Sequence, residues 1–549
     1  MTESLATMLV AAVVYERNGD LPSVTALVLY PLVARTFGLL AAWFGVMVVR
    51  TDDTEVPMNA LARGYYVTSL LAAVGAVGCA RWLLGAHWIA FGGCAVLGSV
   101  CSLVHFHVVQ YYSEHKYRPV RSLAEAARGG PTLATLRGML TAVEGTILLI
   151  GVVLTTVFGA HYVGHLTGLE RGGVLGVAIA VGGMLGAAPY VLAMDRMGSI
   201  VDTARGIIEM TVAADGPDVR ARARLLDAVG TTAKSFTKSL AAVTSGLACF
   251  LLLAVFLFDV WSAGTDVAPV AGSADLIDAS SPLLYLGALT GSLVVLAFVW
   301  ATLRRFVGAG RDVVNDLRVQ LGLASDPQAG SPLAGQGAAL SANLSPEDEG
   351  PPSDELTERS GGLTGGMATA RRYPVDPSES PERFPVDDAQ LAFVEIVSRI
   401  ALRGMLAPAL VGLSIPVFVG AALRLLATED RVASSAEALV ALLVVATIAG
   451  ALGSLLFTNA GSAWDNAKKY IETGAYGGRY IFDAPARPSV SPGGQQSSAG
   501  RSELDNPTYV AAVISDTIGD PLKGAIGPAI QALVMTLATL ALVFLPFFL

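Results

Sequence analysis

The chain has 549 residues, of which 53% are hydrophobic and only 15% are charged, and its mean hydropathy is +0.58. A soluble core cannot bury so much apolar surface, so the composition predicts an integral membrane protein. The net charge of −9 disfavours a nucleic-acid partner, because binding a phosphate backbone requires a basic face.

Apolar runs of spanning length recur along the chain. A transmembrane helix needs about 20 mainly apolar residues, and ten runs reach that length. They cover residues 24–50, 64–86, 88–112, 135–160, 174–195, 231–259, 282–306, 402–424, 436–457 and 527–549. An eleventh run, Leu5 to Val14, is shorter and is expected to be a helix whose beginning is missing. The sequence therefore predicts an all-α membrane protein with about eleven transmembrane helices.

Lysine and arginine are concentrated in alternate loops, which follow the spans ending near residues 50, 112, 195, 306 and 457. The positive-inside rule places these loops in the cytoplasm. If the short first run counts as a span, Met1 lies on the cytoplasmic side and Leu549 outside. We expect a multi-pass protein of a bacterial cell membrane.

Two cytoplasmic segments, residues 324–386 and 483–506, are rich in Gly, Pro, Ser and Ala and poor in large apolar residues. This composition predicts disordered linkers. The chain is thereby divided into a helical membrane core at 1–323, a linker at 324–386 and a carboxy-terminal group of membrane helices at 387–549, interrupted by the flexible loop at 483–506.

Charged residues occur at helical spacing where three apolar spans meet the cytoplasm. The three groups are Asp195, Asp202 and Glu209; Asp465, Lys468, Lys469 and Glu472; and Asp516, Asp520 and Lys523. Carboxylates with lysines and no histidine suit Mg²⁺ that bridges to a phosphate, because hard ions take oxygen ligands and lysine supplies a point cation. Solvated helix ends or internal ion pairs are the alternative interpretation. The position of all three groups at the mouths of membrane helices favours a functional role.

Two carboxy-terminal blocks resemble the signatures of membrane-bound, ion-translocating pyrophosphatases. These are NAGSAWDNAKKYIE at 459–472 and ISDTIGDPLKGAIGP at 514–528, and further similar stretches lie at 50–67, 110–126 and 393–405. The resemblance implies a bundle of sixteen helices, of which the eleven spans here match the last eleven. It also implies a homodimer in the lipid membrane that hydrolyses Mg-pyrophosphate in a cytoplasmic funnel and moves H⁺ or Na⁺ outward.

The same resemblance assigns roles to individual positions. It implies that Asp202, Asp465, Asp516 and Asp520 are Mg²⁺ ligands and that Lys468 and Lys523 bind pyrophosphate. Asp195 matches an acidic position of the helix that carries Asp202. Lys234 falls where potassium-independent members carry a lysine, so its ammonium would replace K⁺. A K⁺-insensitive, proton-pumping type is therefore expected.

Some positions depart from the family pattern. An acidic motif that supplies Mg²⁺ ligands and one water-activating aspartate is expected just before Met1. Gly524 stands where the second water-activating aspartate is expected, Thr231 replaces an asparagine, Met535 replaces a lysine, and a DNAGG turn reads DTARG at 202–206. Because water attack needs a general base and cations, the chain alone is expected to hydrolyse pyrophosphate poorly or not at all.

Glu144 lies within an apolar span, where an ionisable group suggests either ion passage or a buried structural acid.

The sequence leaves two functions of the chain open. The chain is either a pyrophosphate-energised pump, in which a longer product or a companion chain supplies the missing helices, or a catalytically impaired paralogue that acts as a membrane scaffold or regulator.

Overall fold

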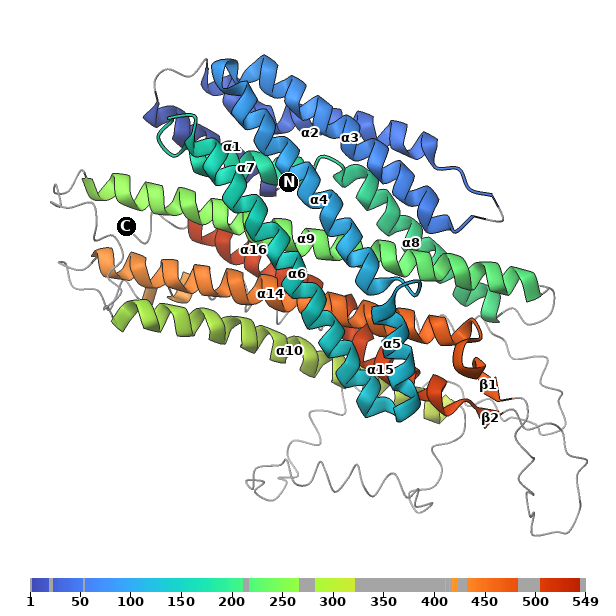
Figure 1. Cartoon of the computed structure of the whole chain (residues 1–549). Helices are drawn as coiled ribbons and strands as arrows, with labels where there is room; N and C mark the ends of the chain where they lie inside the picture. The colour runs from blue at the N-terminus through green and yellow to red at the C-terminus, as the bar shows by residue number, and fades with distance from the viewer. Residues whose placement is uncertain are drawn as a thin grey trace, which may run out of the picture. The chain divides into compact units, whose positions relative to one another are not determined.

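The structure, a computed structural model, is almost entirely helical in the residues it describes (Figure 1). These are residues 2–18, 23–52, 55–210, 217–265, 282–320, 432–481 and 504–543, with a few helical positions between 410 and 422. The predicted all-α class is confirmed. The chain divides into two compact units, one formed by residues 1–303 and 407–549 and the other by residues 304–406.

The longer helices of the described residues follow one another along the chain in this order. They are α1 (Thr2–Arg17), α2 (Val24–Val48), α3 (Pro57–Leu83), α4 (Trp88–Ser113), α5 (Arg118–Ala126), α6 (Pro131–His165), α7 (Gly172–Met184), α8 (Ala188–Met210), α9 (Pro217–Thr265), α10 (Pro282–Gln320), α14 (Val432–Glu472), α15 (Pro507–Pro521) and α16 (Gly527–Val543). Short 3-10 turns lie at Gly85–His87, Ala127–Gly129 and Ala475–Gly477.

Eight helical stretches among the described residues are long and apolar enough to cross a membrane. A ninth is obtained if α7 and α8, which are bent by 41° relative to each other, form one broken span. The 16 residues of α1 are fewer than a span needs, and the span predicted at 402–424 lies mostly outside the described residues. The count of eleven spans therefore stays a prediction.

The predicted division of the chain at residues 324 and 386 also lies outside the described part, as do most residues of the loop predicted at 483–506. The last residues of that loop are described, and Leu504–Asp505 forms the strand β2. It pairs antiparallel with β1, Tyr480–Ile481. Asn506 then caps α15, since its side chain accepts a hydrogen bond from the Thr508 backbone N–H. The strand pair and the Asn506 cap together fix the residue at which α15 begins.

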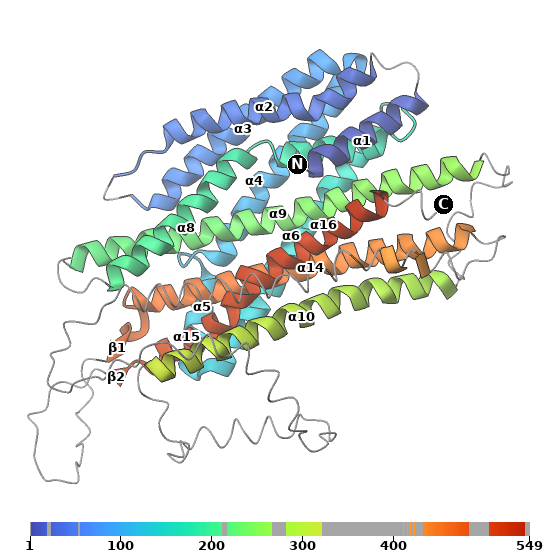
Figure 2. The same cartoon turned by 180° about the vertical axis from the view of Figure 1, so that it is seen from behind.

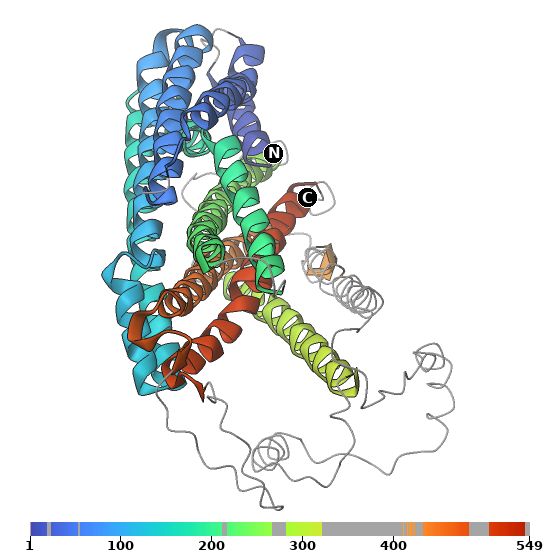
Figure 3. The same ribbon diagram turned by 90° about the vertical axis from the view of Figure 1, so that its right-hand side faces the viewer.

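The helix α9 lies inside the first unit and packs against α1, α4, α8, α14 and α16. Figures 2 and 3 show it between the blue amino-terminal helices and the orange and red carboxy-terminal ones. Its most apolar stretch is 67% buried, against 28% for the corresponding stretch of α2. Polar side chains of α9 are buried as well, among them Asp227, Thr231 and Ser235 at 0–3% exposed.

Glycines allow two close helix crossings near these polar side chains. A Cβ atom added to Gly230 of α9 would lie 2.9 Å from the Cα atom of Gly198 in α8, and one added to Gly461 of α14 would lie 2.6 Å from the carbonyl oxygen of Gly519 in α15. Small residues let membrane helices approach backbone to backbone. The two crossings bring α8 onto α9 and α14 onto α15.

Candidate functional site

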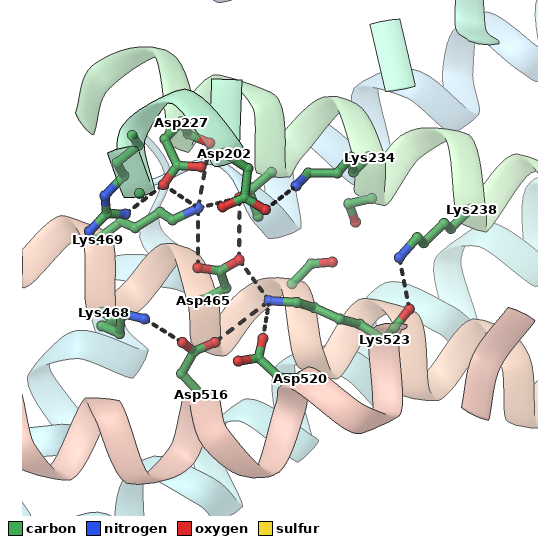
Figure 4. A pocket seen from close by; sticks show the side chains of 15 residues that line it. Asp202, Asp227, Lys234, Lys238, Asp465, Lys468, Lys469, Asp516, Asp520 and Lys523 are labelled. Atoms are coloured by element: carbon green, nitrogen blue, oxygen red, sulfur yellow. Dashed lines mark hydrogen bonds and ion pairs between the residues drawn. The ribbon is translucent and has the colours of Figure 1, made fainter. Parts of the chain in front are cut away.

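Between these crossings lies a cavity of about 340 Å³, lined by side chains from α8, α9, α14, α15 and the turn after α15 (Figure 4). Its charged lining, among the described residues, consists of the carboxylates Asp202, Asp227, Asp465, Asp516 and Asp520 and the cations Arg205, Lys234, Lys238, Lys468, Lys469 and Lys523. Residues more than 300 positions apart in the chain thus meet in one place.

The structure brings together every residue for which the sequence implied metal or pyrophosphate binding. The four aspartates at 202, 465, 516 and 520 and the lysines at 234, 468 and 523 all line the cavity. The two remaining candidates lie elsewhere. Asp195 is on α8 outside the cavity lining, and Glu144 is exposed on α6.

Lys523 is the point at which three of the carboxylates converge. Its Nζ atom lies 2.6 Å from Asp465 Oδ2, 2.8 Å from Asp520 Oδ1 and 3.6 Å from Asp516 Oδ1. Asp520 is mostly exposed, whereas the side chain of Asp516 is 4% exposed. The ammonium group therefore joins two buried carboxylates to one at the opening of the cavity.

Lys468 binds the other oxygen of the same buried aspartate. Its Nζ atom donates to Asp516 Oδ2 over 2.6 Å. The neighbouring Trp464 is fixed by a hydrogen bond from its Nε1–H to the carbonyl of Ala134 in α6, 3.2 Å long. Because Trp464 and Lys468 are one helical turn apart on α14, this anchor orients the lysine toward α15.

A second cluster of ion pairs lines the cavity around Asp227. Asp227 of α9 is fully buried, and its Oδ2 atom lies 2.5 Å from Arg205 Nη1 and 2.9 Å from Lys469 Nζ. The Nη2 group of Arg205 also binds Glu472, which accepts a hydrogen bond from the Tyr509 hydroxyl. Burial of these charges is tolerable because each carboxylate has cationic or hydrogen-bonding partners.

The sequence did not predict the roles of Asp227 and Lys238, and it marked Arg205 only as a departure from the family pattern. For Asp227 and Lys238, the spacing in the sequence contains a usable signal. Asp227, Lys234 and Lys238 are seven and then four residues apart, a spacing that places their side chains along one face of a helix. The partners of Arg205 come from α9 and α14, and no local spacing indicates that contact.

Lys234 and Thr231 link α9 to the carboxylates of other helices. Lys234 Nζ donates to Asp202 Oδ2 over 2.9 Å, and the Asp202 side chain is 59% exposed. Thr231, which stands where an asparagine was expected, donates to Asp465 Oδ2 over 3.2 Å and accepts a hydrogen bond from Lys469. The hydroxyl of Thr231 thus keeps a polar contact at that position.

The carboxylates of the cavity suit Mg²⁺ only if phosphate oxygens also bind the ion. Within the described ranges, no three Asp, Glu, His or Cys side chains form a group that could hold a metal by themselves. Mg²⁺ is commonly bound through one or two carboxylates, with water and substrate phosphates completing its shell. Asp516 Oδ1 is buried, lies 3.6 Å from Lys523 Nζ and accepts no hydrogen bond from the described residues, so an oxygen ligand is available within this set.

The sequence of the chain is similar to a known family and to several named proteins. A family model described as "Inorganic H+ pyrophosphatase" matches residues 1–328 and 386–544. The chain is 32% identical to a protein of Moorella thermoacetica named "K(+)-insensitive pyrophosphate-energized proton pump 2", over 94% of this chain and 62% of that protein. It is 30% identical to "Pyrophosphate-energized membrane proton pump 3" of Arabidopsis thaliana, over 100% of this chain and 60% of that protein.

A third relative, a "K(+)-insensitive pyrophosphate-energized proton pump" of Caldanaerobacter subterraneus, is 28% identical over 95% of this chain and 62% of its own length. The chain thus spans about three fifths of the length of the curated relatives it matches. The family model covers most of the chain, and both carboxy-terminal signature blocks contribute to the cavity. The chain therefore belongs to the inorganic H+ pyrophosphatase family.

Proposed function

We propose that this chain forms the pyrophosphate-binding part of a pyrophosphate-energised proton pump. The observation that carries the proposal is the single cavity in which carboxylates and lysines of four helices meet. The names of the relatives, all of them pyrophosphate-energised proton pumps, support the same function.

The side chains of the cavity suit a diphosphate that arrives with Mg²⁺. Lys468 and Lys523 are compact cations with several donors, which suits phosphate oxygens. In the structure their ammonium groups form ion pairs with Asp516 and Asp465. A diphosphate would take over the ammonium groups, and the released carboxylates, together with Asp202 and Asp520, would bind Mg²⁺. The ion would supply charge stabilisation for the transferring phosphoryl group.

We propose that Lys234 makes the site independent of K⁺. Its ammonium is held at the cavity by Asp202, so a fixed cation is present without any free ion. Two of the relatives named above are K(+)-insensitive pumps, which supports this assignment.

Exposed apolar side chains support a proposal about the surroundings of the chain in the membrane. Apolar residues such as Leu70 of α3, Phe158 of α6 and Leu289 of α10 are 66–75% exposed, as expected for side chains that contact lipid or a second copy of the chain. We propose a homodimer in a cell membrane, with Met1 on the cytoplasmic side and Leu549 outside. Glu144 lies on the exposed face of α6 and is assigned no part in the cavity.

Complementation tests the proposed function. The chain is produced together with the part of the Moorella thermoacetica pump that it does not match, and Mg-dependent pyrophosphate hydrolysis and acidification of inverted vesicles are measured. Both activities are expected with the two parts together, and Asp516→Ala in this chain is expected to abolish them. If pyrophosphate binds but neither activity appears when both parts are inserted, the pump assignment is wrong.

A further inference from the structure

The junction between α15 and α16 is a π-helical turn, Leu522–Ile526. The backbone N–H of Gly527 donates to the carbonyl of Leu522, five residues back, instead of to a carbonyl four residues back as in an α-helix. The next residue, Pro528, has no N–H group. Within this described turn, the carbonyl of Lys523 is therefore left without a backbone donor either four or five residues along the chain.

Lys238 of α9 supplies the missing donor. Its Nζ atom donates to the carbonyl oxygen of Lys523 over 3.0 Å. Among the described residues, no ion pair joins Lys238 to Asp195 or to another carboxylate. The backbone carbonyl is the one hydrogen-bond acceptor recorded for this ammonium group in the part of the chain that the structure describes.

The residue whose carbonyl is held in this way also carries the ammonium group at the centre of the cavity. From the same backbone position, the Lys523 side chain reaches Asp465, Asp516 and Asp520. This contact is partly buried, so a carbonyl that lost its donor here would raise the free energy of the turn, and the turn would rearrange to find another partner. Rearrangement of the turn would move the Lys523 side chain away from the carboxylates.

We propose that Lys238 is a positioning residue of the pyrophosphate site. It keeps the π-helical turn in the geometry that directs Lys523 at the three carboxylates, and it joins α9 to the start of the last span. The claim about pyrophosphate rests on the proposed function, whereas the claim about the turn does not.

Hydrogen exchange of the ligand-free full chain in lipid nanodiscs tests the contact itself. Lys238→Met removes the donor, and Lys238→Arg keeps one. In the Met variant, the amides of residues 525–527 are expected to exchange at least roughly tenfold faster, because a hydrogen bond from a charged donor is lost. The Arg variant is expected to restore most of the protection. Unchanged exchange in the Met variant, or equal acceleration along all of α9, would overturn the proposal.

Pro528→Ala provides a matched second variant, because it returns an N–H group to the position five residues after Lys523. In this background the turn has a backbone donor of its own, so Lys238→Met is expected to change the exchange of residues 525–527 much less than in the unaltered chain. The comparison is a double-mutant cycle. Equal effects of Lys238→Met in both backgrounds would contradict the role assigned to the carbonyl.

Pyrophosphate affinity gives the third measurement, read as protection of the chain from trypsin by pyrophosphate with Mg²⁺. Lys238→Met is expected to weaken the affinity roughly tenfold, and Lys238→Met with Pro528→Ala less. Faster exchange of the turn with unchanged affinity would overturn the positioning role. If the unaltered chain binds no pyrophosphate, the proposed function fails, and the two exchange measurements alone decide whether Lys238 holds the turn.

Discussion

Asp227 and Asp202 line the same cavity but differ sharply in their surroundings. The Asp227 side chain is fully buried between Arg205 and Lys469, whereas Asp202 is mostly exposed and forms its ion pair with Lys234. Removal of a buried partner leaves uncompensated charge in a region of low dielectric, while an exposed pair is screened by water.

We therefore predict that Asp227→Ala lowers the free energy of unfolding by about 3–5 kcal/mol. The matched variant Asp202→Ala is expected to lower it by less than about 1 kcal/mol. Both values are obtained from denaturant unfolding of the chain in detergent micelles. Equal losses of unfolding free energy in the two variants would contradict the view that Asp227 neutralises Arg205 and Lys469 in the buried region.

Lys234 leads to a prediction about ions. If its ammonium replaces K⁺, Lys234→Ala is expected to make pyrophosphate binding depend on added K⁺, while the unaltered chain binds equally well in Na⁺ and K⁺ buffers. Lys116→Ala, at an exposed loop position, serves as the control. If pyrophosphate binding by the Lys234→Ala variant does not change with K⁺, the assignment is wrong.

Much of the site was predictable from the sequence because its members are repeated at helical spacing. Asp516, Asp520 and Lys523 follow one another along 8 residues, so the backbone alone brings them close. The pairing of Arg205 with Asp227 and Glu472 joins three helices, and its prediction requires the tertiary packing of α8, α9 and α14.

At the scale of the elements, the crossing of α14 and α15 holds the two signature blocks together. A Cβ atom on Gly519 would lie 2.7 Å from Trp464 Cε3 and 2.9 Å from the Cα atom of Gly461, whereas one on Gly524 would meet no atom of the described residues within 4 Å. The two glycines are 5 residues apart and thus form a natural pair for comparison.

Gly519→Ala is predicted to destabilise the chain by about 1–3 kcal/mol and to weaken pyrophosphate binding, because overpacking pushes α15 away from α14. Gly524→Ala is expected to be neutral within about 0.5 kcal/mol, since the added methyl group has free space. Thermal unfolding and trypsin protection measure the two effects. A stable Gly519→Ala variant with normal binding would contradict the tight crossing.

The predicted spans agree with the helices of the described residues in position, but not in their interruptions. One run at 174–195 is divided between α7 and α8, and the last span is preceded by α15 and the π-helical turn. Hydropathy reports only how apolar a segment is. The π-helical turn before the last span depends on a donor from another helix, Lys238 of α9, which the apolar pattern does not contain.

For the whole molecule, the proposed orientation places the cavity on the cytoplasmic side. Glu125 in α5 and Glu170 after α6 are both exposed and flank the span of α6, and the four native cysteines are buried. In intact cells, a membrane-impermeant maleimide is expected to label Glu170→Cys, and to label Glu125→Cys only after permeabilisation. The reverse pattern would invert the topology.

The most direct test of the account is equilibrium binding of radiolabelled pyrophosphate, with Mg²⁺, to the full chain in lipid nanodiscs. We predict saturable binding that Lys468→Ala and Lys523→Ala each weaken at least roughly tenfold, because each variant removes a charged donor from the cavity, and that Lys116→Ala leaves unchanged. An absence of saturable binding, or an equal effect of all three substitutions, would contradict the claim that this cavity is the pyrophosphate site.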